Sequence, residues 1–416
     1  MSTLGDRSAH PREPEADRLE ILMARIRAEP ARFPDAGAVA AAGGWAEDQA
    51  EALFQLHGHR PVAAFLAEAR VQCACRRLLA GSAPTDAATA AGFGDPAQFR
   101  HGFLAGTGMA PEAYQALGRP GAPPGFTLAL PADYRAEDVL AYHGRDPESR
   151  SEQVAGATLR KAMLVAGRTV LLETAFQDGQ ARCRVLDRDP DRELLAALHR
   201  RAVRMLGLGF DPAPFERFVA DLALNRLVAP RQGLRIPLTA DVWEALVWAV
   251  LGQQVNLAFA YALRRRLTAL CGPAAGRGMT AHPGPAAVAA LEPEQLKPLQ
   301  FSRGKADYLV GLARKVTEGS LPLETLPDGT ASRAAALLSA QRGVGPWTTH
   351  YVLMRGCGFG DCVPLGDAGL TLALQRHLGL DHRPGLKETA ACMAPFAPFR
   401  SLATFHLWAS LKGVPA

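Results

Sequence analysis

The sequence predicts a mainly α-helical protein with a small antiparallel β subdomain, and three observations support this fold class. Helical periodicity of apolar residues runs from Asp17 to about Leu117 and returns from Asp191 to the end of the chain, where the candidate helices include 240–255, 257–271, 303–318 and 368–378. Between these parts, residues 126–188 combine β-branched residues, alternation and turn residues, a mixture typical of strands. The run LGRPGAPPGF at 117–126 concentrates Pro and Gly, which no helix tolerates, and marks the clearest domain boundary.

The bulk composition is that of an ordinary multidomain globular protein. With 416 residues, of which 48% are hydrophobic and 21% charged, the chain can bury two or three domain cores. Apolar runs such as Trp243–Leu251 are short, and Glu244 interrupts that one, so no membrane span is expected. The N-terminal residues contain no apolar stretch, so no signal peptide is expected, and the predicted location is cytoplasmic.

The seven cysteines show no spacing that favours a metal. The sequence has no C-x-x-C pair and no four-thiol pattern of the kind that holds zinc or an iron–sulfur cluster. Cys357 and Cys362 lie close together with His350 nearby, but two thiols and one histidine are a poor ligand set. We therefore expect no required metal, and we interpret the thiols as buried or idle.

Composition shifts divide the chain into five segments. These are a flexible N-terminus (1–16), a helical domain (17–117), a Pro/Gly linker (118–125), a small antiparallel β subdomain (126–190) and a second helical domain (191–416). Residues 231–416 carry 19 Lys and Arg against 12 Asp and Glu, whereas residues 1–118 carry 11 against 14. If the protein binds a polyanion, the last third is expected to make most of the contacts.

The first helical domain contains two similar units. Residues 38–58 and 86–108 each place an Ala-rich helix, a Gly turn followed by an aromatic residue, and a second helix ending near Gly. A long helix at 65–80 joins them. The pattern predicts two helix-turn-helix motifs, and, including GMAPEAY at 108–114, it resembles the DNA-binding domain of AraC-type regulators.

DNA reading by such a domain would depend on the second helix of each unit. In the first unit this helix carries Glu47 and Asp48, which would repel phosphate. The second unit offers better candidates for DNA contact, which are Gln98, Arg100 and His101. Two interpretations stay open: an operator-binding domain, or a helical docking module that keeps the fold without binding DNA.

The segment GVGPWTTHYVLMRG, which starts at Gly343, predicts a helix–hairpin–helix. A helix ends near Gln341, glycines let the backbone turn tightly, and Pro346 suits the first turn of the next helix. Backbone N–H groups at that helix start can hold a phosphate without reading sequence. The expected phosphate-binding residues are Arg342, Gly343, Val344 and Gly345. The plain alternative is an ordinary helical hairpin that contains glycine.

Together with the following VPLGD, this segment resembles the helix–hairpin–helix DNA glycosylase superfamily, and within it the bacterial 3-methyladenine DNA glycosylase II type. The likeness extends to LRIPLTADVWEALVWAVLGQQVNLAFA at 234–260, FSRGKADYLVGLARKV at 301–316 and PFRSLATFHLW at 398–408. The predicted strands match the extra N-terminal subdomain of that branch. The resemblance covers roughly 126–412 and implies a DNA repair enzyme.

The resemblance implies that an alkylated base is flipped out of the duplex and that Asp367 catalyses its release. Cleavage of the N-glycosidic bond passes through an oxocarbenium-like sugar, which a fixed carboxylate stabilises. Asp367 precedes the predicted helix 368–378, whose N-terminal dipole favours a negative charge, and it could also orient the attacking water. The alternative is that Asp367 is only the N-cap of that helix, and the two roles are compatible.

The base pocket implied by the resemblance is aromatic. Trp347, Tyr351 and Trp408 would line it, because electron-rich rings attract cationic purines such as 3-methyladenine and 7-methylguanine. Each of the three could instead be a core residue. Lyase members of the superfamily carry a lysine where this chain has Trp347. We therefore expect a monofunctional enzyme that uses water, rather than a lyase acting on oxidised bases.

Further expectations come from the resemblance alone. Gln253 and Gln254 match the loop-and-wedge region that fills the gap left by the flipped base, although Gln254 replaces an apolar residue there. Arg342 replaces a proline before the hairpin. No cofactor is expected, but a structural Na+ or K+ bridging to phosphate could be held by the backbone carbonyls of Ser339, Gln341 and Val344.

The predicted partner is double-stranded DNA containing alkylated bases, with no membrane and no obligate protein partner. The arrangement resembles the regulator–glycosylase fusions of the bacterial adaptive response, but the sequence lacks the cysteine cluster of their methyl-accepting module. The alternative function is a transcription regulator of the alkylation response whose glycosylase-like half does not cut. The intact Gly343, Gly345, Trp347 and Asp367 favour the enzyme.

Overall fold

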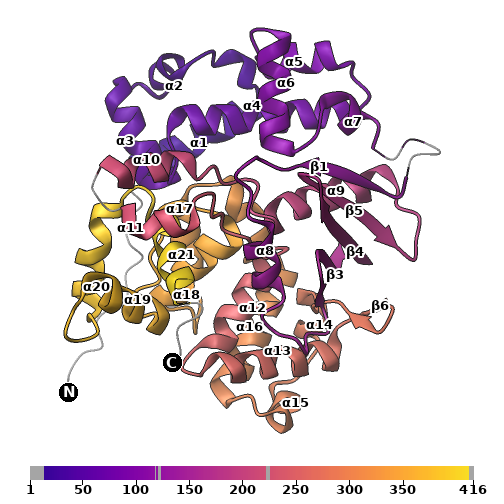
Figure 1. Ribbon diagram of the computed structural model, residues 1–416, viewed down its shortest axis with the longest axis vertical. Helices are drawn as coiled ribbons and strands as arrows, with labels where there is room; N and C mark the ends of the chain where they lie inside the picture. The colour runs from indigo at the N-terminus through magenta and orange to yellow at the C-terminus, as the bar shows by residue number, and fades with distance from the viewer. Residues whose placement is uncertain (1–13, 118, 120–122, 222–224, 412–416) are drawn as a thin grey trace.

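The computed structural model describes residues 14–117, 119, 123–221 and 225–411. Figure 1 shows a layer of N-terminal helices at the top, a sheet on the right and a body of C-terminal helices below and to the left. This mainly α architecture with a small antiparallel sheet confirms the predicted fold class. Most of the predicted flexible segment 1–16 and part of the predicted linker 118–125 lie outside the described residues. Within the described ranges, no helix is long and apolar enough to cross a membrane.

The N-terminal domain is helical and follows the two-unit pattern of the sequence. Its helices are Pro14–Ala28 (α1), Ala36–Gly43 (α2), Glu47–Gly58 (α3), Val62–Leu79 (α4), Pro84–Ala91 (α5), Pro96–Thr107 (α6) and Pro111–Gln115 (α7). Asp35 and Asp95 cap α2 and α6, because their side chains accept hydrogen bonds from the backbone N–H groups of Ala38 and Gln98, each at 2.8 Å. Short polar residues in the turns therefore set where these helices begin.

A five-stranded antiparallel sheet follows, in the order β1-β5-β4-β3-β2. Its strands are Gly125–Ala129 (β1), Glu152–Ala155 (β2), Thr158–Val165 (β3), Arg168–Gln177 (β4) and Gln180–Leu186 (β5). Asp178 and Gly179, at φ 51° and 69°, form the tight turn between β4 and β5, which needs two left-handed residues. The sequence analysis did not predict α8 (Ala136–His143) between β1 and β2, because eight residues are too few to show clear periodicity.

The C-terminal domain is built almost entirely from helices around one apolar core. Its longer helices are Arg192–Met205 (α9), Ala213–Asp221 (α10), Val242–Gly252 (α12), Leu257–Cys271 (α13), Arg303–Thr317 (α16), Ala331–Ser339 (α17), Pro346–Val352 (α18), Ala368–Leu378 (α19), Leu386–Met393 (α20) and Arg400–Ser410 (α21). Its short elements are Asn225–Val228 (α11), Ala274–Gly276 (β6), Met279–Thr280 (β7), Pro285–Ala289 (α14) and Pro293–Leu296 (α15).

Two details of this domain differ from the prediction. The expected helix at 240–255 ends at Gly252, and continuous helical structure after Asp191 is interrupted by the two-stranded hairpin of β6 and β7. The hairpin turns on Arg277 and Gly278, at φ 49° and 74°. Two strands this short carry too few residues for a period-2 pattern to appear in the sequence.

The second helix-turn-helix unit shares a hydrophobic core with the sheet. Phe103 of α6 belongs to the same buried cluster as Leu128 of β1, whereas the first unit has a separate core. The ring of His199 in α9 donates from Nε2 to the backbone oxygen of Thr107 in α6 at 2.7 Å. The Pro/Gly segment 118–125 therefore connects two parts of one packed core.

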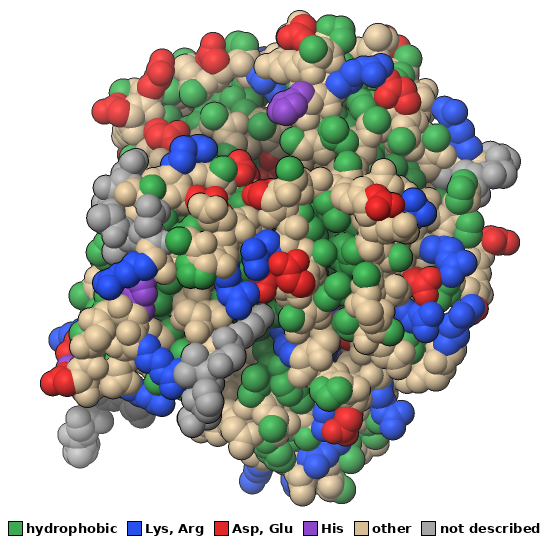
Figure 2. Space-filling view, in the orientation of Figure 1, with side chains coloured by type: hydrophobic (Ala, Val, Ile, Leu, Met, Phe, Trp, Pro, Cys, Tyr) green, Lys and Arg blue, Asp and Glu red, His purple; other side chains and the backbone are tan. Residues whose placement is uncertain are grey.

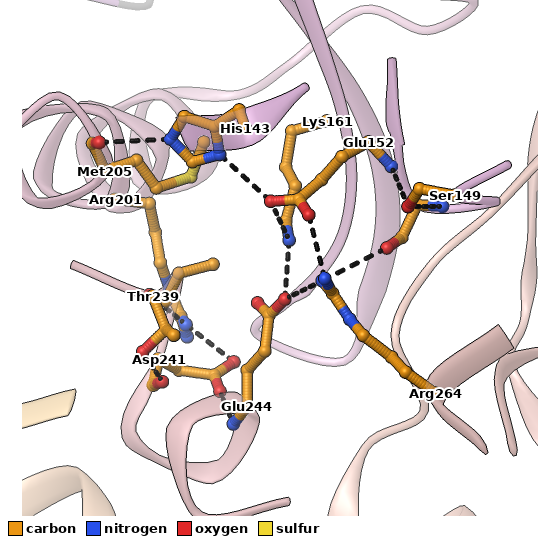
Figure 3. Close-up of polar contacts among 12 residues, drawn as sticks. His143, Ser149, Glu152, Lys161, Arg201, Met205, Thr239, Asp241, Glu244 and Arg264 are labelled. Carbon is orange, nitrogen blue, oxygen red and sulfur yellow. Dashed lines mark hydrogen bonds and ion pairs between the residues drawn. The ribbon is translucent and has the colours of Figure 1, made fainter. Parts of the chain in front are cut away.

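A buried ionic cluster ties the sheet to the C-terminal helices (Figure 3). Lys161 of β3 contacts Glu244 of α12 at 2.7 Å and Glu152 of β2 at 3.1 Å. Arg264 of α13 contacts Glu244 at 2.5 Å and Glu152 at 3.0 Å, and His143 of α8 contacts Glu152 at 3.0 Å. Burial alone would raise the pKa of Glu244, but the charges of Lys161 and Arg264 lower it to about 2. The charge that interrupts the apolar run in the sequence thus joins two subdomains.

Candidate active site

The hairpin between α17 and α18 packs against Tyr308 of α16 on one side and is exposed to solvent at Arg342 and Gly345. Gly343 adopts φ 84°, a left-handed conformation, and a Cβ there would lie 2.3 Å from Cγ of Tyr308. Val344 is buried, whereas Gly345 is exposed, caps α18, and has open space where a Cβ would be. Arg342 is exposed, with its guanidinium 5.9 Å from the centre of the Tyr308 ring. The turn therefore exposes Gly345, at the start of α18, and the cation of Arg342 to solvent.

Both carboxylate oxygens of Asp367 accept hydrogen bonds from tryptophan. Nε1 of Trp408 donates to Oδ1 at 2.9 Å, and Nε1 of Trp347 donates to Oδ2 at 3.1 Å. Oδ1 also accepts from the backbone N–H of Leu370 at 2.8 Å, so Asp367 is the N-cap of α19. The side chain is half-buried. Donors from α18, α19 and α21 thus fix the carboxylate in one orientation.

The three aromatic residues expected in the pocket form one group beside this carboxylate. The rings of Trp347 and Tyr351 stack, with centroids 5.5 Å apart and planes at 27°. Tyr351 and Trp408 lie 6.4 Å apart at 41°. Tyr351 is buried, while both tryptophans are partly exposed. Tyr351 therefore also serves the core, and the tryptophans form the accessible part of the group.

The turn after α12 is tied to the hairpin. The side-chain amide of Gln253 donates to the backbone oxygen of Gly343 at 2.8 Å and to the hydroxyl of Thr348 at 2.9 Å. Gln254 is exposed and adopts a left-handed conformation at φ 54°. Of the two residues expected in the wedge region, Gln253 thus connects the turn to the hairpin, and Gln254 is the one exposed to solvent.

Lys305, which was not predicted as a site residue from the sequence, holds this turn in place. The buried ammonium of Lys305 donates to the backbone oxygens of Val250, Leu251 and Gln253, at 3.2, 2.6 and 2.7 Å. The carbonyl of Val250 also accepts from the backbone N–H of Gln253, whereas those of Leu251 and Gln253 lie where a helix end leaves carbonyls without intrahelical donors, so Lys305 satisfies the end of α12. Burial lowers the pKa of Lys305 to about 8. The available signal was a lysine on the apolar face of a predicted helix.

A second group missed from the sequence is an arginine surrounded by aromatic rings. The guanidinium of Arg145 lies 3.8 Å from the ring centre of Tyr142, 5.3 Å from that of Trp248 and 6.0 Å from that of Tyr261. Its charge also acts on the hydroxyl of Tyr351, so this cluster adjoins the aromatic group around Asp367. Trp248 and Tyr261 lie more than one hundred positions after Arg145 in the sequence, so no local pattern marks the cluster.

The candidate DNA contacts of the second helix-turn-helix unit lie exposed on α6, which Figure 1 shows at the top of the molecule, away from α19. The side-chain oxygen of Gln98 accepts from the backbone N–H of Gly94 at 3.0 Å. Arg100 pairs with Glu112 at 2.7 Å. His101 is exposed on the same helix. Two of the three side chains are therefore engaged in local contacts.

The carbonyl groups expected around a monovalent cation lie in the hairpin turn. The backbone oxygen of Gln341 accepts from the N–H of Val344 at 3.1 Å, which leaves it one further lone pair. Ser339 is the last residue of α17, so its carbonyl lacks an intrahelical partner. Such oxygen donors fit Na+ or K+. Among the described residues, no group of three or more His, Cys, Asp or Glu side chains is placed to hold a metal ion.

Comparison with known proteins places these features in a family. Residues 247–398 match the HhH-GPD superfamily of base excision DNA repair proteins, and residues 39–116 match a helix-turn-helix domain. A DNA-3-methyladenine glycosylase of Bacillus subtilis is 35% identical over 202 residues, which are 48% of this chain and 67% of that protein. A probable bifunctional transcriptional activator/DNA repair enzyme AlkA of Mycobacterium tuberculosis is 34% identical over 294 residues, 69% of this chain and 57% of that protein.

Solved structures share the fold. A 3-methyladenine DNA-glycosylase from Archaeoglobus fulgidus superposes with a TM-score of 0.62 at 21% identity, covering 69% of this chain and 99% of that one. An 8-oxoguanine glycosylase/lyase of Clostridium acetobutylicum, solved with double-stranded DNA, superposes with a TM-score of 0.54 at 14% identity, covering 67% and 92%. At these identities the likeness establishes the fold alone.

The helix–hairpin–helix, the carboxylate at the start of α19 and the matched segments define the class: the chain belongs to the HhH-GPD superfamily of base excision DNA repair proteins. Within that superfamily it is a DNA glycosylase of the 3-methyladenine DNA glycosylase II type, fused to an AraC-type helix-turn-helix domain.

Proposed function

We propose that this protein binds double-stranded DNA, flips out alkylated purines such as 3-methyladenine and 7-methylguanine, and hydrolyses their N-glycosidic bonds. The observation that carries the proposal is the fixed orientation of Asp367 between the indole N–H groups of Trp347 and Trp408. The names of the relatives from Bacillus subtilis and Mycobacterium tuberculosis support the choice of substrate and of repair chemistry.

Binding of the base depends on the aromatic group. Alkylation at N3 or N7 leaves the purine ring with a positive charge, and the faces of Trp347, Tyr351 and Trp408 attract such a ring. A normal, neutral purine gains less from the same contacts. Because the methylated purine is positively charged while bound to the sugar, it departs as a neutral molecule and is a better leaving group than a normal purine. Binding and chemistry therefore select the same substrates.

Asp367 stabilises the positive charge that develops on the sugar as the bond to the base breaks. Because its two oxygens already accept three hydrogen bonds, the carboxylate does not reorient during the reaction. A water molecule on the face of the sugar opposite the base then completes the hydrolysis, and Asp367 orients it. The chain has Trp347 where a lyase would carry its lysine, so no imine forms and the phosphate backbone stays intact.

Contacts with DNA backbone come from the hairpin. Backbone N–H groups at the start of α18 and the exposed Arg342 bind a phosphate near the flipped nucleotide, and Gln254 occupies the gap in the stack. The carbonyls of Ser339, Gln341 and Val344 would hold a Na+ or K+ ion, whose positive charge would strengthen the attraction for a phosphate. No redox or organic cofactor enters this mechanism.

The test is release of methylated bases from dimethyl-sulfate-treated duplex DNA by the wild-type protein and by Asp367→Asn. The substitution keeps the N-cap and the size of the side chain but removes its charge, so release should fall about 100-fold or more while binding to duplex DNA persists. Asp381→Asn, an exposed aspartate in the turn after α19, is the control and should release bases at the wild-type rate. Equal release by Asp367→Asn would refute the role of the carboxylate.

The same reaction separates hydrolysis from lyase chemistry. A monofunctional enzyme leaves intact abasic strands that break only on later treatment with hot alkali, and borohydride traps no protein–DNA adduct. Strand cleavage without alkali, or a trapped adduct, would contradict the monofunctional assignment.

The name of the Mycobacterium tuberculosis relative favours an additional transcriptional role. A salt series of gel shifts with the full-length Asp367→Asn protein on undamaged duplexes of different sequence would detect sequence-specific DNA binding.

A further inference from the structure

The first helix-turn-helix unit packs directly against the segment that leads to Asp367. His59, which follows α3 and adopts φ 54°, places its ring at 5.8 Å and 78° from the ring of Phe359. Nδ1 of His59 lies 3.6 Å from Sγ of Cys362. A Cβ on Gly360 would come within 3.1 Å of the backbone oxygen of His59, so the two backbones are also close.

The contacted segment, residues 359–363, precedes the turn that carries Asp367. On its other side Asp361 forms a two-pronged ion pair with Arg400 at 2.6 and 2.5 Å, and the hydroxyl of Ser401 accepts from the N–H of Cys362 at 2.9 Å. Both partners belong to α21, the helix that carries Trp408. The segment thus lies between His59 and α21, and four residues after it comes Asp367.

A second contact, from the helices that share a core with this unit, reaches the helix that leads to the hairpin. The carboxylate of Glu20 in α1 accepts from the backbone N–H of Thr330, the N-cap of α17, at 2.8 Å and pairs with Arg333 at 2.9 Å. The ring of His57 in α3 bonds to the hydroxyl of Ser332 at 2.8 Å. The N-terminal domain therefore holds both α17, before the hairpin, and the segment before Asp367.

The helix α3 is at the same time poorly suited to a DNA groove. Its C-terminal end is buried against α17, because His57 is only 6% exposed. The exposed part of its first turn carries Glu47 and Asp48. Figure 2 shows acidic side chains gathered at the upper left, over the region where Figure 1 places α2 and α3. Steric access and charge thus agree that α3 does not face phosphate.

From these contacts we infer that the first half of the N-terminal domain, which is α1 to α3 with His59, is a docking module that braces the active site, with His59 and Glu20 as positioning residues. His59 positions the segment 359–363 and through it Asp367, and Glu20 positions α17 and through it the phosphate-binding hairpin. The helix α3 is used for this internal contact rather than for reading DNA. The inference rests on the proposed glycosylase function.

The chemistry of the contact is that of a packed, uncharged ring. Burial lowers the pKa of His59 to about 4, so at neutral pH the imidazole is neutral and packs edge-on against Phe359. Arg60, the next residue, places its guanidinium 5.8 Å from the centre of the same Phe359 ring. Phe359 is itself 1% exposed, so removal of the histidine ring leaves a cavity beside the segment rather than a surface change.

The test uses the full-length protein with His59→Asn. Asparagine tolerates the left-handed conformation of this position, so the variant removes the ring without adding backbone strain. We expect the single-turnover rate of base release from methylated duplex DNA to fall about tenfold, since small displacements of a catalytic group are costly. Its affinity for a duplex with a non-cleavable abasic analogue should stay within about twofold, and the cavity should lower its Tm while the protein stays folded at the assay temperature.

Glu20→Ala probes the second contact, and the expected pattern is reversed: affinity for the abasic-analogue duplex falls several-fold, and the single-turnover rate at saturating enzyme changes little. Gln49→Ala, on the exposed face of α3, is the matched control and should change neither quantity. The different effects of the two variants on rate and affinity distinguish positioning from a general loss of stability, which would lower both together with Tm.

If a folded His59→Asn protein released bases at the wild-type rate, the inference that His59 positions the active site would be wrong, while the proposed function would stand. Should that variant fail to fold, Gly360→Ala replaces it, because its Cβ displaces the backbone of His59 from the opposite side. Equal rates for Gly360→Ala and the wild type would overturn the inference in the same way. A wild-type protein that releases no base would instead refute the proposed function itself.

Discussion

At the scale of single residues, hydrogen bonds fix the position of two charged side chains in the site, the half-buried carboxylate of Asp367 and the buried ammonium of Lys305. Asp367 accepts hydrogen bonds from three helices, and the ammonium of Lys305 donates to three backbone carbonyls at the end of α12. Each arrangement fixes one charged atom against a rigid part of the fold. Small changes of charge at these positions should therefore change catalysis more than they change stability.

Lys305 predicts a decline of the excision rate above about pH 8. Burial lowers its pKa to about 8, so above that pH the neutral amine has two N–H donors for three carbonyls, and the turn carrying Gln254 loosens. The lowered pKa makes the folded protein release this proton more readily than the unfolded chain. Raising the pH from 8 towards 10.5 therefore stabilises the fold through this group, and unfolding is not the cause of the decline.

Single-turnover rates and Tm measured from pH 6 to 10 test this expectation. The variant Lys305→Met should be slower than the wild type at neutral pH and should lack the inflection near pH 8. Persistence of the same inflection in Lys305→Met would assign it to another group.

At the scale of elements, the hairpin between α17 and α18 depends on one glycine far more than on the other. Gly343 needs a left-handed φ of 84° and lies against Tyr308, whereas Gly345 meets open space. The two positions look equivalent in the motif Gly-x-Gly. The packing of α16 under the turn makes them different, since Tyr308 belongs to that helix.

The variant Gly343→Ala should lose both stability and DNA affinity. Its Cβ would lie 2.3 Å from Tyr308, so the turn must move, at a cost of roughly 1–3 kcal/mol in the free energy of unfolding. We expect affinity for an abasic-analogue duplex to fall tenfold or more. Gly311→Ala, which adds a methyl group in open space on α16, is the control and should be neutral or slightly stabilising. Unchanged affinity of Gly343→Ala would exclude the hairpin from DNA binding.

At the scale of the whole molecule, the N-terminal domain, the sheet and the helical body are joined by shared packing. The second helix-turn-helix unit and the sheet have one apolar core, and the cluster of Glu152, Lys161, Glu244 and Arg264 joins the sheet to α12 and α13. The helix α12 also positions the turn with Gln253 and Gln254. Unfolding of the sheet is therefore expected to be coupled to loss of the active site.

Replacing Glu244 with glutamine should destabilise the protein by roughly 3–5 kcal/mol, because it leaves the buried charges of Lys161 and Arg264 without one of their partners. Denaturant unfolding measures the loss. Glu173→Gln, in a more exposed ion-pair group on the same sheet, is the control and should cost less than about 1 kcal/mol. A loss for Glu244→Gln no larger than that of the control would contradict the role of the cluster.

The same group predicts a loss of stability in acid. The pKa of Glu244 is lowered to about 2 from an ordinary value of 4.5, so its contribution to stability is complete above about pH 4.5 and is lost as the pH falls towards 2. The wild type should therefore lose stability more steeply than Glu244→Gln across this window. Parallel acid-unfolding curves would show that the carboxylate is not ionised in the folded protein.

The sequence by itself determined the features that short segments encode. Periodicity and capping placed helices at 257–271, 303–318 and 368–378 within one residue of their observed ends, and put Asp367 at the start of the last one. The Gly-x-Gly turn and its following helix are equally local. Each of these signals acts through contacts within a few residues, so they can be recognised before the fold is known.

Only the tertiary structure decided which distant residues meet. The carbonyls at the end of α12 find their donor in Lys305, more than fifty residues later, and the docking of His59 on Phe359 joins positions three hundred apart. The core shared across residues 118–125 likewise arises from packing that crosses a Pro/Gly segment typical of a domain boundary. Contacts of this kind form between surfaces that exist only after folding. Local sequence patterns therefore do not predict which side chains are buried, which hydrogen-bond partners they find, or that α3 packs against α17.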